Sequence, residues 1–211
     1  MTKTTQNTEQ AILAAAKQEF LLKGYDGART TTIAQAAGVT HAMLHYYFRT
    51  KRNIFERIID SELDLLIESI LKVFGSSSLP IEERLRDCVS CHFDFIMANP
   101  ELPRFIINEV VTRPERHDIL RKRISVLIGK IAGETQREID EAAAKGEIER
   151  IDFRMVMLDI LSLNIFPFLI YPLVQPLFGE LTSDRKRFLE MRKEEAIETI
   201  MRRIKKTNTD L

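Results

Sequence analysis

Apolar residues recur at intervals of three and four along almost the whole chain, and this spacing restricts the fold more than any other feature. Within residues 51–73 the apolar stripe consists of Phe55, Ile59, Leu63, Leu66, Ile70 and Val73. Such gaps place one continuous apolar edge along a helix, whereas a half-buried strand needs an alternation of period two. No segment alternates convincingly in that way. The sequence therefore predicts an all-α protein.

Glycine, proline and capping residues indicate where the helices begin and end. Asn7 or Thr8 can cap the first helix, Gly24 can end it, and Thr50 can cap the fourth. Proline residues separate the later helices, because proline lacks a backbone donor and disfavours helix in the residue before it. We expect helices over residues 8–23, 31–37, 40–48, 51–73, 81–98, 101–112, 115–145, 152–178 and 183–206, with a break at GSSSLP (75–80).

The charge of the chain is unevenly distributed. It has 31 Lys and Arg against 31 Asp and Glu, so its formal net charge is zero. Residues 1–55 hold seven basic and three acidic residues, a net charge of +4 that leaves −4 on the remainder. A net charge of zero therefore does not exclude a nucleic-acid-binding protein. The uneven distribution restricts a nucleic-acid-binding surface to the N-terminal quarter of the chain. The polar N-terminus has no secretory signal and two cysteines make no disulfide framework, so we expect a cytoplasmic protein.

The segment TTIAQAAGVTHAMLHYYF (31–48) carries most of the functional signal. Two short helices separated by Gly38 form a helix-turn-helix pattern, and Ala34 and Ala37 are small enough for the helices to cross closely. The expected buried side consists of Ile33, Val39, Leu44 and Phe48. The outer face of the second helix then consists of His41, Ala42, Met43, His45 and Tyr46.

The longer run GYDGARTTTIAQAAGVTHAMLHYYFRTKRNIF (24–55) resembles the DNA-binding domain of the TetR family of bacterial transcriptional regulators. The resemblance implies that the second short helix reads the major groove, through Thr40, His41, Ala42, Met43, His45, Tyr46 and Tyr47. It implies phosphate contacts at Thr30, Thr31 and Lys51. The sequence departs from the family pattern at His41, Met43, His45 and Asn53, where Lys or Arg, Ser or Thr, Tyr and Glu are usual.

The two recognition-helix histidines allow a prediction about pH. His41 and His45 face the anionic groove, so we expect DNA affinity to rise as the pH falls through about 6.5, where histidine ordinarily gains a proton. Two histidines at positions i and i+4 also share a helix face and could bind a metal, but no third ligand lies nearby in the sequence. We therefore expect no metal and no cofactor.

The C-terminal half contains a second motif, Cys88-Val89-Ser90-Cys91-His92, which spells the c-type haem attachment pattern. Haem attachment needs export, for which the chain shows no signal. The two thiols lie three residues apart on a predicted helix, where they serve as small core residues. A redox or metal sensor is the alternative that remains open.

The resemblance also implies a small-molecule effector bound among the middle helices. The expected effector residues are polar side chains on apolar faces together with aromatic and Met neighbours: His92, Phe95, Phe105, Asn108, Glu109, Met155, Asp159, Asn164 and Tyr171. Asp159 lies in an apolar stretch, and a buried carboxylate needs a cationic ligand or an ion pair. An ion pair at a dimer contact is the alternative for this residue.

The expected domains are a helix-turn-helix domain over residues 1–50, a connecting helix over 51–74, and a helical effector-binding and dimerisation domain over 75–211. The last two helices are the expected dimer contact. Residues 160–179 carry no charge and would just span a bilayer, but they contain three prolines, and we expect a kinked helix at a protein interface rather than a membrane partner.

These features predict a ligand-responsive repressor that binds double-stranded DNA at a palindromic operator as a homodimer. The chain has no Gly-rich phosphate loop, nucleophile elbow or metal-binding helix motif, so we expect no enzyme. The alternative is a structural or membrane-associated helical protein without specific DNA binding.

Overall fold

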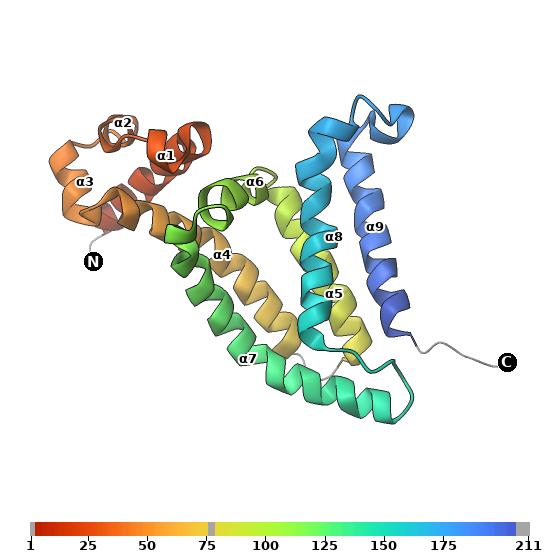
Figure 1. Cartoon of the computed structure of the whole chain (residues 1–211). Coiled ribbons are helices and arrows are strands. Elements are labelled where there is room, and N and C mark those ends of the chain that lie inside the picture. Colours follow the sequence, from red (N-terminus) through yellow and green to blue (C-terminus); the bar gives the residue numbers. More distant parts are fainter. Residues whose placement is uncertain (1–2, 76–78, 206–211) are drawn as a thin grey trace. The chain divides into compact units, whose positions relative to one another are not determined.

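The computed structural model describes residues 3–75 and 79–205 (Figure 1). Within these residues the chain is helical, and its β-structure is limited to one isolated bridge between Ile148 and Lys205. The elements are α1 (Lys3–Gly27), α2 (Thr30–Ala36), α3 (His41–Phe48), α4 (Lys51–Gly75), α5 (Ile81–Ala98), α6 (Leu102–Ile106), the π-helical turn η1 (Ile107–Val111), the 3-10 turn η2 (Pro114–Arg116), α7 (His117–Ala144), α8 (Phe153–Val174), the 3-10 turn η3 (Gly179–Thr182) and α9 (Arg185–Ile204). The all-α prediction is confirmed.

Most helix boundaries lie within a few residues of the expected ones, and the main differences concern the first helix, the segment 101–112 and the end of α8. The first helix begins at Lys3, so the expected cap at Asn7 or Thr8 is wrong. Gly24 has the non-helical angles φ 67° and ψ 175° and interrupts the helix where its end is expected, and a short helical stretch follows up to Gly27. The expected helix over 101–112 consists of α6 followed by a π-helical turn. The helix α8 ends at Val174 instead of at residue 178, and Pro167 and Pro172 both lie inside it. The expected break at 75–80 falls partly on residues 76–78, which lie outside the described residues.

The chain forms two compact units. The first unit comprises Met1–Leu65 and Phe105–Arg123, and the second comprises Leu66–Arg104 and Ile124–Leu211. The helices α4 and α7 both continue from one unit into the other. A segment that is distant in sequence, residues 105–123, thus packs with the N-terminal helices. The boundaries that we expect at residues 50 and 74 stay predictions.

The core of the first unit is formed by one face of each N-terminal helix. Ile12, Ala16 and Phe20 of α1 are completely buried, as their spacing predicts. Ile33, Leu44 and Phe48 of the two short helices are buried as well, whereas Val39 is only half-buried. The first turns of α4 add Ile54, Phe55 and Ile58. The side chain of Thr50 accepts a hydrogen bond from the backbone of Asn53 at 3.1 Å, which confirms the expected cap of α4.

The second unit packs α5, α8 and α9 side by side (Figure 1). Its main core includes Leu85 and Val89 of α5, Val156 and Ile160 of α8, and Ile200 of α9. The side-chain amide of Gln136 bridges to α8, because its oxygen accepts the backbone N–H of Phe153 at 2.8 Å. Asp184 caps α9 by accepting from the backbone of Lys186 and Arg187.

Candidate DNA-binding site

The helix α3 is fixed at both of its ends. Gly38 has φ 67°, a backbone conformation that residues with a Cβ rarely adopt, and it provides the sharp turn after α2. The hydroxyl of Thr40 caps α3 by accepting the backbone N–H of Met43 at 3.2 Å. Leu44 and Phe48 anchor the inner face in the core. This local geometry presents the opposite face of α3 to solvent.

The exposed face of α3 coincides with the predicted base-reading residues. Met43 is 42% exposed and Tyr46 is 81% exposed, although both are large apolar or aromatic side chains. His41, Ala42 and His45 are exposed beside them, as is Thr40 at the helix start, whereas Tyr47 is half-buried. Such a surface offers methyl, imidazole and hydroxyl groups to base edges and phosphates.

The two histidines of α3 lie against each other. The ring centroids of His41 and His45 are 4.4 Å apart in an edge-to-face arrangement. His41 Nε2 shares a hydrogen bond of 3.0 Å with the Thr30 hydroxyl, and His45 Nδ1 lies 2.9 Å from the carbonyl oxygen of Arg49. Because a carbonyl only accepts, His45 Nδ1 carries the proton. His45 Nε2 is therefore the nitrogen left for a base or a phosphate.

The residues expected to contact phosphates are not equally available. Thr31 is exposed at the start of α2, and Thr30 is half-buried and bonded to His41. The ammonium of Lys51 donates to the carbonyl oxygens of Ala28 at 3.1 Å and Asp26 at 3.4 Å, so it also stabilises the end of α1. Arg49, an exposed cation with φ 57° at the C-terminal end of α3, is not among the residues that the sequence predicts to contact DNA. Arg49 is one of the seven basic residues that give residues 1–55 their positive net charge, so the charge distribution could have indicated it.

The expected effector residues are distributed over both units. Phe105, Asn108 and Glu109 belong to the first unit, and the other six belong to the second. Asn108 and Met155 are exposed. Asp159 is not buried, since 38% of its side chain is exposed, and it forms an ion pair with Arg203 of α9 in the same chain. These residues are therefore not gathered in one place by the fold of either unit.

Two of them, His92 and Asn164, form a buried polar pair. The side-chain amide nitrogen of Asn164 donates to Val89 O at 2.9 Å and to His92 Nδ1 at 3.1 Å. Burial lowers the pKa of His92 to about 4, so the ring is neutral at pH 7. The amide oxygen of Asn164 is buried and has no hydrogen-bond partner among the described residues. An unpaired buried acceptor is uncommon and calls for a physical reason.

The cysteine motif lies on α5, where Cys88 is completely buried and Cys91 is half-buried. Burial raises the pKa of the Cys88 thiol to about 12, so this thiol is not a reactive thiolate. His92 turns its Nδ1 to Asn164 instead of to the thiols. These observations favour a packing role for Cys88.

The described geometry, two short helices crossing at a glycine turn with an exposed polar second helix, defines a helix-turn-helix DNA-binding protein. Residues 12–58 match the model of the bacterial regulatory proteins of the tetR family. Residues 12–58 thus match the DNA-binding domain of the TetR family, which is a family of transcriptional regulators.

Two curated relatives and one solved structure illustrate the similarity. The transcriptional activator FasR of Mycolicibacterium smegmatis is 30% identical over 49% of this chain and 48% of its own length. The repressor NicS of Pseudomonas putida is 25% identical over 66% of this chain and 65% of its own length. The chain thus covers about half to two thirds of these relatives. A Clostridium perfringens protein described as a fatty acid metabolism regulator is 23% identical, with a TM-score of 0.72 over 93% of this chain and 100% of that chain.

Proposed function

We propose that the protein is a homodimeric, cytoplasmic, non-enzymatic repressor that binds a palindromic operator and is released by a small-molecule effector. The observation that carries this proposal is the exposed face of α3, where His41, Met43 and Tyr46 are exposed to solvent while Leu44 and Phe48 of the same helix are buried. Base reading is assigned to Thr40, His41, Ala42, Met43, His45, Tyr46 and Tyr47, and phosphate binding to Thr30, Thr31 and Lys51.

A gel shift with the DNA upstream of the protein's own gene tests DNA binding. Tyr46→Ala removes an 81% exposed side chain, and we expect it to weaken specific binding by about tenfold while the oligomeric state is unchanged. Leu22→Ala is the matched control, since Leu22 is 79% exposed on α1 outside the proposed DNA face. Equal binding by wild type and Tyr46→Ala, or no binding of wild type to upstream DNA, would contradict the proposal.

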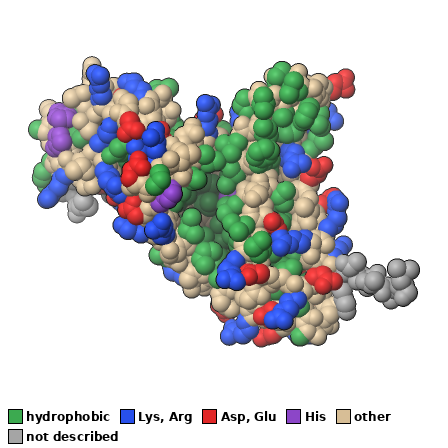
Figure 2. Space-filling view, viewed as in Figure 1, with side chains coloured by type: hydrophobic (Ala, Val, Ile, Leu, Met, Phe, Trp, Pro, Cys, Tyr) green, Lys and Arg blue, Asp and Glu red, His purple; other side chains and the backbone are tan. Residues whose placement is uncertain are grey.

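The proposed dimer contact is the outer face of α8 and α9. Leu158, Leu161 and Phe166 of α8 are 37–58% exposed although they are large and apolar. A surface depression of about 530 Å³ is lined by Leu161, Ser162, Leu163, Ile165, Phe166, Pro167, Leu169 and Arg192. Figure 2 shows hydrophobic side chains gathered at the C-terminal end of α8 and the following turn. A two-fold dimer through this face would place two recognition helices in successive major grooves, ~34 Å apart.

Dimerisation is tested by sedimentation of Phe166→Glu, with Val126→Glu as a control on α7, where Val126 is 54% exposed. We expect Phe166→Glu to give monomers and Val126→Glu to remain dimeric. By length and composition α8 could also cross a membrane, and 28% of its most apolar window is buried. A wild-type monomer that floats with lipid vesicles would therefore support the membrane-associated alternative instead.

Effector binding is assigned to the second unit, beside His92 and Asn164. The unpaired amide oxygen of Asn164 supports this assignment, because a donor group on a ligand would satisfy it. The other residues proposed for effector binding in this unit are Phe95, Met155, Asp159 and Tyr171. Since one structural neighbour is described as a regulator of fatty acid metabolism, fatty acids and acyl thioesters are the first compounds to test by thermal shift.

A further inference from the structure

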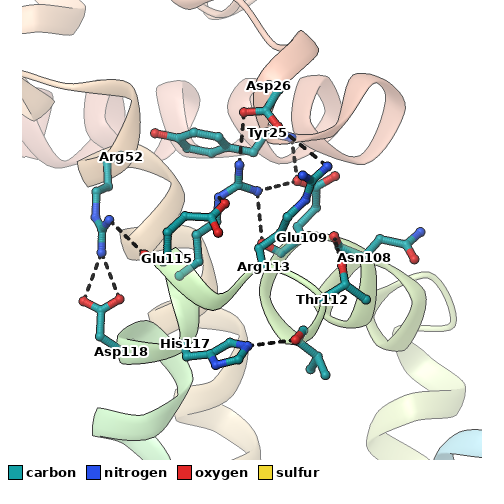
Figure 3. Close-up of polar contacts among 12 residues, drawn as sticks. Tyr25, Asp26, Arg52, Asn108, Glu109, Thr112, Arg113, Glu115, His117 and Asp118 are labelled. Carbon is teal, nitrogen blue, oxygen red and sulfur yellow. Dashed lines mark hydrogen bonds and ion pairs between the residues drawn. The ribbon is translucent and has the colours of Figure 1, made fainter.

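A cluster of polar contacts surrounds residues 24–29, which run from the interruption of α1 at Gly24 to the start of α2 and which we call the α1–α2 turn (Figure 3). Glu109, on the π-helical turn, accepts the backbone N–H of Tyr25 at 3.0 Å across 84 residues of sequence. This approach needs a glycine at position 24, because a Cβ there would lie 2.5 Å from Glu109 Oε1 and the residue has φ 67°. The Gly-aromatic pair at the start of the helix-turn-helix segment thus has a structural reason.

Arg116 connects Glu109 on the π-helical turn with Asp26 in the α1–α2 turn. Its guanidinium donates to Glu109 Oε2 at 2.9 Å, to Glu109 O at 3.1 Å and to Asp26 Oδ1 at 3.0 Å. The same group lies over the ring of Tyr25, 4.2 Å from its centroid. Arg116 is only 6% exposed, so its charge is directed at these partners and not at solvent or DNA.

The α1–α2 turn leads directly to the proposed DNA-binding groups. Lys51 donates to carbonyl oxygens of the turn and lies 4.7 Å from the centroid of the Tyr25 ring. Thr30 follows the turn and is hydrogen-bonded to His41, the first residue of α3. A displacement of the turn would therefore move Thr30 and Lys51 and would change the support of α3 at its N-terminal end.

The segment that carries Glu109 and Arg116 is itself held against α4. Arg52 donates to both carboxylate oxygens of Asp118 at 3.0 Å, and Arg123 donates to Asp60 at 2.6 Å. These contacts fix the first two turns of α7, the helix that continues from the first unit into the second. Residues 107–123 are thus bound to both α1 and α4, the helices that precede and follow the helix-turn-helix pair in the sequence.

We propose that Glu109 and Arg116 are positioning residues for DNA binding: they hold the α1–α2 turn in the conformation that presents Thr30, Lys51 and α3 to the operator. This inference rests on the proposed function. It replaces the effector role expected for Glu109, because both of its carboxylate contacts are made to the DNA-binding unit. It also means that the first unit, which binds DNA in our proposal, includes residues 105–123, far beyond the helix-turn-helix segment in the sequence.

The test uses the full chain and the double variant Glu109→Leu/Arg116→Met, which exchanges a buried charged pair for apolar side chains of similar length. Such exchanges are often neutral for stability, so the variant is expected to stay folded and dimeric. We expect it to bind the upstream DNA about tenfold more weakly, and the Tyr25 amide to exchange faster with solvent. Arg113→Met is the matched control, since Arg113 is half-exposed on the same segment and lies 3.9 Å from Asp26.

The outcomes separate this inference from the proposed function. Weaker DNA binding with an unchanged melting temperature and faster exchange at Tyr25, while Arg113→Met behaves as wild type, supports positioning. Faster exchange with unchanged DNA affinity overturns it, as does a loss of affinity that is matched by Arg113→Met or explained by general unfolding. Failure of the wild type to bind upstream DNA contradicts the proposed function itself, and the positioning role with it.

Discussion

Two buried polar clusters differ in how their groups are satisfied. In the first unit, Arg116 donates to two carboxylates and a backbone carbonyl, and every contact has an ionised partner or a backbone oxygen. In the second unit, His92 and Asn164 form a neutral pair, and one amide oxygen remains unpaired. Charged clusters fix geometry strongly because losing one partner strands a buried charge, whereas a neutral pair is held more weakly.

This difference matches the roles that we propose for the two units. The DNA-binding unit must present Thr30, Lys51 and α3 in one geometry, and a cluster of directed, charge-assisted hydrogen bonds provides it. In the effector-binding unit, polar side chains must exchange hydrogen-bond partners when a ligand enters. The neutral pair of His92 and Asn164, with its unpaired amide oxygen, permits that exchange at a smaller cost in free energy. Measuring what each cluster contributes to the free energy of unfolding tests this difference.

The largest effect is expected for Arg116→Met alone. This variant leaves the carboxylate of Glu109, whose side chain is 14% exposed, without its cationic partner, and we expect a loss of about 3 kcal/mol in the free energy of unfolding. Adding Glu109→Leu should recover most of that loss, because no charge is then stranded. Urea denaturation of the two single variants and the double variant measures the coupling. Strictly additive losses would show that the pair contributes no mutual stabilisation.

An intermediate effect is expected from acid. Burial lowers the pKa of His92 to about 4, below the ordinary histidine value of about 6.5, so the unfolded chain binds a proton at pH 5 that the folded chain does not. Stability should therefore fall as the pH falls from about 6.5 towards 4, by about 2 kcal/mol between pH 6.5 and 5 at ~1.4 kcal/mol per pH unit.

Comparing wild type with His92→Gln isolates this contribution, since glutamine keeps an acceptor for Asn164 but does not titrate. The difference in unfolding free energy between the two proteins should shrink with acid and level off below about pH 4. A constant difference across this range would show that His92 titrates in the folded protein as it does in the unfolded chain.

The recognition face was predictable because helical periodicity alone separates its buried and exposed residues. Leu44 and Phe48 fall on one side of α3, and Met43 and Tyr46 on the other, as their positions in the sequence require. Ile12, Ala16 and Phe20 are likewise buried because four-residue spacing places them on one face.

The cluster around Arg116 was not predictable in the same way. Glu109 and Tyr25 are 84 residues apart, and no periodicity relates them. Side-chain chemistry made Glu109 a plausible effector residue, whereas the fold pairs it with a cation and a backbone N–H. Asp159 shows the same limit, because the nearly uniform apolar sequence of α8 does not reveal which face reaches Arg203. Periodicity thus fixes the faces of a helix but not the partners of its polar groups.

The smallest effect is expected for Asn164→Leu, which should cost about 1 kcal/mol or less. The variant loses two hydrogen bonds, each contributing about 1 kcal/mol net, but it also removes a buried oxygen that has no partner and adds apolar contact with the surrounding core. Urea denaturation at pH 7 measures this cost beside that of Arg116→Met. If Asn164→Leu is as destabilising as Arg116→Met, then the amide oxygen is satisfied in solution, as by an enclosed water, and the contrast between a fixed charged cluster and an exchangeable neutral pair fails.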